Sequence, residues 1–302
     1  MPETPYPARK TRVAVIGLGA MGLPMARRLA NAFPVTVFDT ATGRGAAVDE
    51  ATEAATPAAA ATDADIVVLA VRDQDQVADA LFGADGVAYA LRPAGIVVLT
   101  STVGPDAARA TAARLAERDL VLVDAPVSGG PARAGTGDLL IVVGAEESAL
   151  EAAKPVLDRL ASTVTVVGPN PGDGQALKAI NQLLAGVHIA AAAEAVALAR
   201  ELGLDPAIVI DSLSRGAAGS FMLADRGPRM LDAYHNGAQV RSRLDIFVKD
   251  MGIVTGIAKD AHVPVPLAAA AHQLYLLGER IGLGAADDSS IVTVLSPKET
   301  AR

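Results

Sequence analysis

The first half of the chain alternates short apolar runs with longer stretches that mix alanine with charged residues. The runs are rich in Val, Ile and Leu, and they lie at 12–19, 35–39, 64–71, 94–102, 119–127, 138–145 and 162–168. The stretches between them, such as 104–119, are rich in Ala, Arg and Glu, as helices are. Strands that alternate with helices indicate βαβ units, and runs that are apolar throughout indicate strands covered on both faces. This pattern predicts a doubly wound parallel α/β sheet.

The alternation ends at a Gly- and Pro-rich segment near residue 168, and no strand pattern follows it. Apolar residues instead recur with helical spacing, over 175–202, about 206–214, 221–233, 245–262 and 266–282. The first of these would form a helix about 42 Å long, at 1.5 Å per residue. We therefore expect a tail at 1–10, an α/β domain at 11–168 and an all-helical domain at 169–302, joined by the helix at about 175–202.

Composition and charge narrow the possible partners. Of the 302 residues, 51% are hydrophobic and 20% are charged, and the formal net charge is -8 with a pI near 5.0. An acidic chain lacks the basic surface that nucleic acid or an anionic membrane would require, so we expect neither as a partner. The absence of cysteine excludes thiolate chemistry, and the four histidines lie far apart, so we expect no metal.

Two segments bear on location in the cell. Residues 1–12 are polar and Pro-rich, without the basic-then-apolar order of a signal peptide, and we expect a short disordered tail there. The most apolar long segment, 183–199, contains His188 and Glu194 and is expected to be a buried helix, with His188 also buried. The expected location is the cytoplasm.

The first predicted strand ends in a glycine pattern typical of dinucleotide binding. Gly17, Gly19 and Gly22 have G-x-G-x-x-G spacing between a strand and a helix, and this context strengthens an otherwise weak pattern. The glycines allow a tight turn, close approach of the backbone to a pyrophosphate and close helix–strand packing. The start of the helix then offers amide donors to phosphates. The pattern predicts a Rossmann domain; the alternative is a plain strand-to-helix turn.

The second predicted strand ends in Asp39, 22 residues after Gly17. A carboxylate at this position accepts hydrogen bonds from the ribose hydroxyls and repels a 2′-phosphate, so NAD is favoured over NADP. Arg44, five residues further on, keeps NADP open as the alternative. Other residues at these strand ends are expected to contact the cofactor: Leu18, Ala20, Met21, Thr40 and Val71.

Four ordered segments resemble the signatures of the β-hydroxyacid dehydrogenases, which include 3-hydroxyisobutyrate dehydrogenase and tartronate semialdehyde reductase. They are GLGAMGLPMARRLA, VDAPVSGGPARAGTGDL, GDGQALKAINQ and VKDMGIV, and the resemblance runs from Arg12 to about Leu295. It implies a Rossmann domain, an all-helical domain, and homodimers or homotetramers whose helical domains interlock. The second half, through QLLAGVHIAAAAEAVALA and LDIFVKDMGIV, is most similar to the L-threonate dehydrogenase branch.

The resemblance also implies roles for individual residues. Lys178 matches the catalytic lysine of the family, and Asn181 and Gln182 match two positions that are commonly paired asparagines. The glutamine is a departure typical of the threonate branch. That branch has His where this chain has Asn181, which leaves the exact substrate open while the reaction class stands.

Two further segments match binding positions of the family. Ser128, Gly129 and Gly130 match the loop that holds the substrate carboxylate, and Thr102 and Lys249 match cofactor contacts. The hydroxyl and free amides of the serine–glycine segment would form a compact anion-binding nest at the carboxyl end of a strand. Taken alone, this segment is equally an ordinary Gly-rich turn.

The chemistry of alcohol oxidation agrees with the lysine assignment. Loss of hydride from an alcohol carbon requires removal of the hydroxyl proton, and a positioned base contributes roughly 10²–10⁴-fold. Lys178 is the natural candidate, and we expect desolvation in an interdomain cleft beside a cationic nicotinamide ring to lower its pKa. Asn181 and Gln182 share its helix face at i+3 and i+4 and would orient it. The alternative is a surface lysine on a solvated face.

These observations predict NAD-dependent oxidation of a small hydroxy acid, with L-threonate as the first candidate. The alternative substrates are 3-hydroxyisobutyrate, tartronate semialdehyde and 2-(hydroxymethyl)glutarate. A non-catalytic NAD-sensing protein on the same fold is the alternative from another class, and the retention of Lys178 and Asn181 argues against it.

Overall fold

The computed structural model describes residues 10–235 and 237–297, and most of the tail expected at 1–10 lies outside them. The chain divides into two compact units, with the boundary between Lys178 and Ala179. Each unit has its own hydrophobic core.

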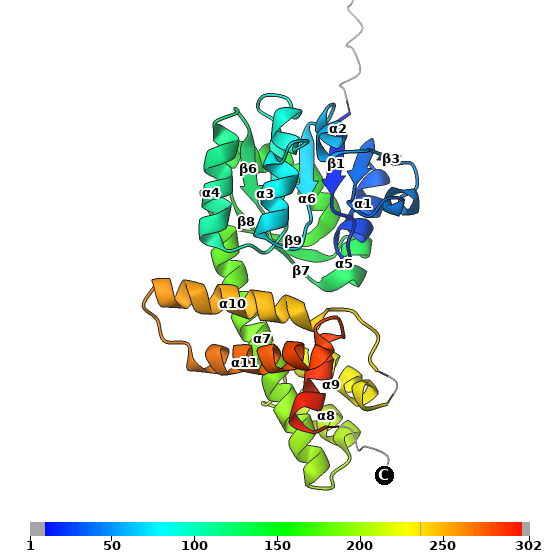
Figure 1. The fold of residues 1–302 in the computed structure, drawn as a ribbon, viewed down its shortest axis with the longest axis vertical. Coiled ribbons are helices and arrows are strands. Elements are labelled where there is room, and N and C mark those ends of the chain that lie inside the picture. Colours follow the sequence, from blue (N-terminus) through cyan, green and yellow to red (C-terminus); the bar gives the residue numbers. More distant parts are fainter. Residues whose placement is uncertain (1–9, 236, 298–302) are drawn as a thin grey trace, which may run out of the picture. The chain divides into compact units, whose positions relative to one another are not determined.

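The first unit is built on a mixed sheet (Figure 1), and its longer strands match the apolar runs of the sequence. The strands are β1 (Val13–Ile16), β2 (Val35–Phe38), β3 (Thr52–Glu53), β4 (Ile66–Leu69), β5 (Ile96–Leu99), β6 (Val121–Asp124), β7 (Val127–Ser128), β8 (Leu139–Gly144) and β9 (Ala161–Gly168). Strands β3-β2-β1-β4-β5-β6 lie in this order and are all parallel. This is the strand order of a Rossmann fold, and it confirms the expected doubly wound sheet.

The parallel arrangement stops after β6. Strand β8 pairs antiparallel with β6 and β7, and β9 pairs parallel with β8. The apolar run at 138–145 is one of the runs that led us to expect parallel units throughout, and this expectation was wrong for β8. An apolar run shows that a strand is buried but carries no information on its direction.

Helices cover both faces of the sheet, because successive strand side chains point to opposite sides. Val13 and Val15 of β1 belong to one core with Met25 and Leu29 of α1, whereas Ile16 belongs to the other. The helices are α1 (Gly22–Ala30), α2 (Pro57–Ala61), α3 (Gln74–Phe82), α4 (Pro105–Ala116), α5 (Gly130–Thr136) and α6 (Glu147–Leu160). Helices α1 and α6 contribute to the first core, and α2, α3 and α4 contribute to the second. The strands are therefore buried from both sides, as their composition predicts.

The second unit is helical. Its elements are the larger part of α7 (Asp173–Glu201), α8 (Pro206–Ser214), α9 (Phe221–Tyr234), α10 (Leu244–Asp260), α11 (Pro266–Gly278), a π turn (Glu279–Leu283), a 3₁₀ turn (Asp288–Ile291) and α12 (Val292–Leu295). The core includes Phe247 and Tyr275, whose rings stack with centroids 5.4 Å apart. The Tyr275 hydroxyl donates to the carbonyl of Gly186 at 2.9 Å, which ties α11 to α7. A Rossmann domain followed by a helical domain is the expected fold class.

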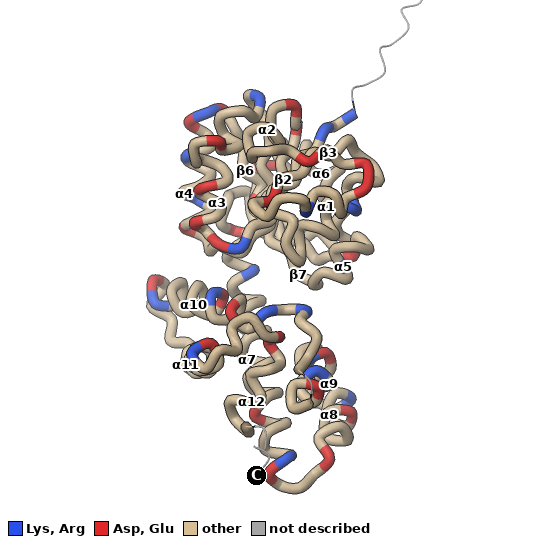
Figure 2. Tube along the Cα trace, turned by 45° about the vertical axis from the view of Figure 1, so that its right-hand side comes forward, with Lys and Arg blue, Asp and Glu red and all other residues tan. Residues whose placement is uncertain are grey.

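Helix α7 has the length and hydropathy that a membrane span requires. The buried core helix of a globular protein can have the same length and hydropathy. In α7, 56% of the most apolar 18-residue window is buried inside the protein, as in a core helix. Figure 2 colours Lys, Arg, Asp and Glu along the chain, and between Lys178 and Glu194 the helix contains none of these residues. One expectation for this segment was wrong, because His188 is exposed.

Candidate active site

The glycine loop after β1 shows three different reasons for glycine. Gly17 has φ of +92°, and a Cβ on it would lie 2.5 Å from the Ala70 carbonyl oxygen. A Cβ on Gly22, at the start of α1, would lie 1.8 Å from the Gly17 carbonyl oxygen. A Cβ on Gly19 would meet no atom within 4 Å. Gly17 and Gly22 therefore serve the fold of the loop, whereas Gly19 leaves open space beside the backbone, as close approach of a pyrophosphate requires.

Asp39 follows β2 and lies beside this loop. Its Oδ2 accepts a hydrogen bond from the Leu18 backbone amide at 2.7 Å, and its Oδ1 accepts one from the Ala41 amide at 2.8 Å. Arg44 Nη1 lies 3.5 Å from Asp39 Oδ2, and its side chain is 51% exposed. The structure thus brings together the residue that favours NAD and the arginine that kept NADP open.

The ends of β4 and β5 are joined by Ser101. Its hydroxyl donates to the Val71 carbonyl at 2.7 Å and accepts from the Val71 amide at 3.0 Å. Thr102 is the next residue and is half-buried, whereas Ala20 and Thr40 are exposed at the ends of their strands. Because β1 and β4 are adjacent, these segments lie at the carboxyl edge of the sheet where its strand order reverses, the usual place for a dinucleotide. The open space at Gly19 and the Asp39 carboxylate fit such a ligand.

Lys178 and the serine–glycine segment meet within the first unit. Ser128 ends β7, and Gly129, with φ of +136°, precedes α5. Lys178 is 7% exposed, and its Nζ donates a hydrogen bond to Ser128 Oγ at 3.0 Å. The alternative interpretation of Lys178, a surface lysine on a solvated helix face, is therefore wrong. This arrangement brings a buried amine and a hydroxyl to one point, 50 residues apart in the chain.

A buried carboxylate that the sequence motifs did not single out fixes the start of α7. Asp124, at the end of β6, accepts hydrogen bonds on Oδ2 from the backbone amides of Gly172 at 2.8 Å and Gln175 at 3.0 Å. Burial raises the pKa of Asp124, although these hydrogen bonds and one from the Gln175 side chain oppose the rise. In the sequence, Asp124 lies within the predicted buried run 119–127 and within the segment VDAPVSGGPARAGTGDL, and neither assigns it a task.

Asn181, Gln182 and Lys249 belong to the second unit, where a chain of polar contacts joins them. Asn181 Nδ2 donates to Gln182 Oε1 at 2.8 Å, and Gln182 Nε2 donates to Asp250 Oδ2 at 2.5 Å. Lys249 Nζ lies 2.9 Å from Asp250 Oδ1, and Asp250 is 3% exposed. Asp250 is a second buried carboxylate that sequence reasoning missed. It fixes the Gln182 amide, and Gln182 in turn fixes the orientation of Asn181.

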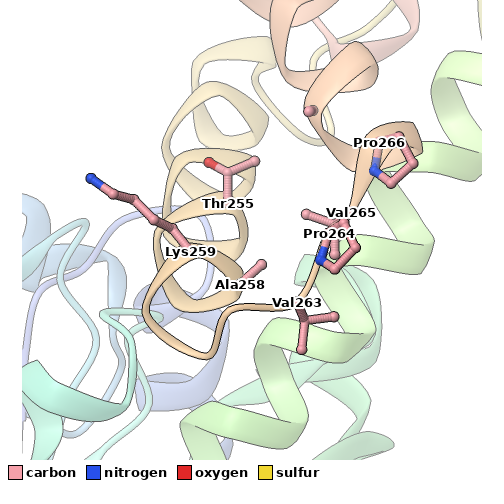
Figure 3. Close-up of a pocket in the computed structure, with 8 residues that line it drawn as sticks. Thr255, Ala258, Lys259, Val263, Pro264, Val265 and Pro266 are labelled. Atoms are coloured by element: carbon pink, nitrogen blue, oxygen red, sulfur yellow. The ribbon is translucent and has the colours of Figure 1, made fainter.

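An apolar hollow of about 370 Å³ lies elsewhere on the second unit (Figure 3). It is bounded by α10 and by the turn that leads into α11, and its lining includes Thr255, Lys259 and Val263. No residue expected to bind cofactor or substrate lines it. Within 10–235 and 237–297, no group of three or more His, Asp or Glu residues could hold a metal ion.

The fold and these residues define a class: a Rossmann-type dehydrogenase with a buried lysine at the carboxyl edge of its sheet. Residues 12–168 match the family model described as the NAD binding domain of 6-phosphogluconate dehydrogenase. Residues 172–295 match the model described as NAD-binding of NADP-dependent 3-hydroxyisobutyrate dehydrogenase. The chain belongs to the β-hydroxyacid dehydrogenase family, and the expected NAD-binding domain is confirmed.

Individual relatives agree with this assignment. The chain is similar to an L-threonate dehydrogenase from Cupriavidus necator, with 40% identity over 93% of this chain and 95% of the relative. It is 32% identical to a 2-(hydroxymethyl)glutarate dehydrogenase from Eubacterium barkeri, over 95% of each chain. A crystal structure of a 3-hydroxyisobutyrate dehydrogenase from Salmonella typhimurium has a TM-score of 0.86 and 36% identity, over 94% of this chain and 99% of that chain.

Proposed function

We propose that this chain oxidises L-threonate, or a closely related small hydroxy acid, with NAD as hydride acceptor and Lys178 as general acid–base. The observation that carries the proposal is the 3.0 Å hydrogen bond between the buried Lys178 Nζ and Ser128 Oγ. It joins the residue suited to proton transfer to the segment suited to holding a carboxylate. The substrate follows from the similarity to an L-threonate dehydrogenase over nearly the whole of both chains.

In this mechanism each residue has a separate task. The substrate carboxylate binds to the Ser128 hydroxyl and to the amides of Gly129 and Gly130, which open α5. Lys178 Nζ takes the hydroxyl proton as the adjacent carbon loses hydride, and a carbonyl remains. NAD, when bound, supplies the hydride acceptor.

Residues at the carboxyl edge of the sheet would hold the cofactor. The start of α1 and the open space at Gly19 suit the pyrophosphate, and Asp39 suits the ribose hydroxyls. Asp39 also supports NAD over NADP, because the exposed Arg44 beside it is already paired with this carboxylate. We assign further contacts to the residues around them: Gly17, Leu18, Ala20, Met21, Gly22, Thr40, Val71, Thr102 and Lys249.

We assign Asn181 and Gln182 to the substrate hydroxyls. The Gln182 amide is held at both ends, by Asn181 and by Asp250. Gln182 therefore acts mainly by orienting Asn181, whose Oδ1 and second amide hydrogen we assign to the substrate. Neutral amides add polarity without a charge that would act on Lys178.

An assay of NADH formation at mildly alkaline pH tests the proposal. Wild type and Lys178→Ala are compared on L-threonate, D-threonate, D-erythronate, D-glycerate, 3-hydroxyisobutyrate and 2-(hydroxymethyl)glutarate, each with NAD and NADP. Tartronate semialdehyde is tested in the reverse direction, as consumption of NADH or NADPH. We expect turnover of L-threonate with NAD that falls at least about 10³-fold in Lys178→Ala, because the base is lost. Lys154→Ala is the matched control, since Lys154 is exposed on α6 and forms an ion pair with Asp158 in the same helix.

Three results would contradict parts of the proposal. Turnover of another acid would move the substrate assignment, and activity that survives in Lys178→Ala would show that another group is the base. Binding of NADH without turnover of any acid in the panel would favour the non-catalytic sensing role.

We also propose separate roles for the two domains, an oligomeric assembly and a cellular location. Residues 11–168 form the NAD-binding domain and also supply the loop for the substrate carboxylate, while 169–302 supply Lys178, Asn181, Gln182 and Lys249 and serve assembly into a homodimer or homotetramer. The support for assembly is a set of exposed apolar side chains, including Leu184 at 50%, Leu198 at 60%, Leu267 at 71% and Leu277 at 51%. Large exposed apolar surface of this kind marks contact with another chain. The proposed location is the cytoplasm.

A further inference from the structure

Gln175 is a buried residue to which neither the family signatures nor the proposed mechanism gives a task. It lies on α7 one turn before Lys178 and is 1% exposed. Its Oε1 accepts hydrogen bonds from the backbone amides of Val103 at 3.0 Å and Gly104 at 3.1 Å. Its Nε2 donates to the Ser101 carbonyl at 3.0 Å. One side chain thus binds three backbone groups of the loop after β5, those of residues 101, 103 and 104.

Asp124 completes and orients this arrangement. Its Oδ1 accepts the second hydrogen of Gln175 Nε2 at 2.9 Å, while its Oδ2 accepts the Gly172 and Gln175 backbone amides. Every donor and acceptor of the Gln175 amide is therefore used, and the amide has only one satisfied orientation. The same carboxylate fixes the first turn of α7, so helix and side chain are held together.

The loop held by Gln175 is the loop that carries Thr102, a proposed cofactor contact. The helix held by Asp124 is the one that carries Lys178, the proposed base. Ser101, in the same loop, is bonded on its other side to Val71 at the end of β4. The Gln175 amide is therefore a direct link between the cofactor edge of the sheet and the turn before the lysine.

We infer that Gln175, oriented by Asp124, is a positioning residue that sets the place of Lys178 relative to the cofactor loop 101–104. The inference rests on the proposed function, since it takes Lys178 as the base. The position requires an amide, because two backbone N–H groups need an acceptor while a carbonyl and a carboxylate need a donor. An error of about 1 Å in such a placement costs roughly 10²-fold in rate.

Three variants separate positioning from simple loss of stability. Gln175→Ala removes all four side-chain hydrogen bonds. Gln175→Glu keeps the acceptor toward Val103 and Gly104 but places a second carboxylate against Asp124. The double variant Asp124→Asn/Gln175→Glu exchanges amide and carboxylate, so a donor again faces an acceptor and the net charge equals that of wild type. Only the hydrogen bond to the Ser101 carbonyl lacks a donor in the double variant.

Steady-state kinetics give the first readout. We expect kcat to fall about 10²-fold in Gln175→Ala and in Gln175→Glu, with substrate KM changed less than about threefold, since the lost interaction acts on the transition state. The double variant should recover at least about tenfold in kcat over Gln175→Glu. Val156→Ala is the control. Val156 is fully buried on α6 in the same unit, and it belongs to the first core, whereas Val103 of the loop belongs to the second.

Amide hydrogen exchange gives a readout that needs no substrate. Exchange at Val103 and Gly104 should accelerate in Gln175→Ala and remain near wild type in Val156→Ala, because only the first variant removes their acceptor. If wild type turns over no acid, the proposed function fails, and exchange together with NADH affinity still reports on the link. Unchanged exchange, or a double variant no more active than Gln175→Glu, would overturn the inference.

Discussion

At the scale of single residues, the loop 17–22 contains two glycines that the fold requires and one that leaves space for a ligand. Gly17 and Gly22 are required because any side chain would meet backbone atoms. A Cβ added to Gly19 would meet no described atom within 4 Å, and the φ of Gly19 lies outside the positive region, so the fold itself would accept alanine there. The three glycines look equivalent in the sequence, and only their surroundings distinguish them.

Alanine substitutions at two of these positions should therefore have different effects. Gly19→Ala should leave the melting temperature within about 1 °C of wild type but weaken NADH binding at least about tenfold, because a methyl group fills the space needed by the pyrophosphate. Gly22→Ala should lower the melting temperature by several degrees as well, because its Cβ would lie 1.8 Å from the Gly17 carbonyl oxygen. Thermal melts and NADH fluorescence titrations measure both. An unstable Gly19→Ala protein would contradict this division.

The residues found from sequence are those whose neighbours in the chain reveal them. Asp39 follows a strand at a known spacing from Gly17, and Lys178 lies in a recognisable segment. Asp124 and Gln175 also lie in recognisable segments, but nothing near them in the chain reveals their task. Their partners lie about 50 and 70 residues away, and only the folded sheet brings them together. Hydrogen bonds between residues so far apart in the chain produce no periodic pattern from which they could be predicted.

At the scale of elements, the packing of α7 on α10 depends on one small residue. Gly186 lies in α7, and a Cβ on it would be 2.3 Å from the Sδ of Met251, which is fully buried on α10. Glycine in a helix costs about 1 kcal/mol relative to alanine. Because the two helices approach closely at this point, α7 has glycine at position 186 despite its lower helix propensity.

Two glycine-to-alanine substitutions in helices should therefore differ in sign. Gly186→Ala should lower the melting temperature by a few degrees, because overpacking costs about 1–3 kcal/mol and exceeds the gain in helix propensity. Gly256→Ala in α10 should raise it, because nothing lies within 4 Å of the new Cβ and the gain of about 0.5–1 kcal/mol stands alone. Thermal melts of both variants decide the point. A rise in both would show that Met251 moves aside without cost.

The helices and strands predicted from the sequence agree with the structure where the apolar pattern extends over enough residues to be recognised. The apolar runs located the main strands of the sheet, and the helical stretches agree with α8 to α11 within a few residues at their ends. Strands β3 and β7 and helix α12 are two to four residues long, too short for any period to show. The direction of β8 depends on pairing partners, which a single strand does not encode.

At the scale of the whole molecule, the exposed leucines of the second unit bear on assembly. Leu277 lies in the last turn of α11 and is 51% exposed. Leu277→Glu should weaken the proposed oligomer, because a carboxylate buried in an apolar contact is costly. Size-exclusion chromatography with light scattering should show a smaller species at low micromolar protein. Glu279→Gln on the exposed turn is a control, and an unchanged mass in Leu277→Glu would place the interface elsewhere.

Stability in acid depends on a buried charge network that ties the end of the chain to α9. Asp287 is fully buried and accepts hydrogen bonds from Arg229 Nη1 at 2.6 Å, from the Arg241 amide at 2.8 Å and from the Ser289 hydroxyl at 2.6 Å. Burial raises the pKa of Asp287, but the hydrogen bonds from Ser289 and Arg241 and the charge of Arg229 outweigh it and hold the pKa below its usual 3.8. A lowered pKa means that the folded protein prefers the ionised form. The stabilisation is present above pH 3.8 and is lost as the pH falls through the lowered value.

Asp287→Asn should reproduce this loss at neutral pH. Removal of one partner of a buried ion pair costs about 3 kcal/mol, so the melting temperature at pH 7 should fall by roughly 5–10 °C. The difference from wild type should shrink below pH 3.8, where wild type loses the same charge. Burial raises the pKa of the neighbouring Asp288, but Asp288 is present in both proteins and its titration largely cancels from the difference. Thermal melts of both proteins from pH 7 to pH 3 measure the gap, and a gap that stays constant over this range would show that Arg229 is stabilised mainly by Asp225, 3.0 Å away, and not by Asp287.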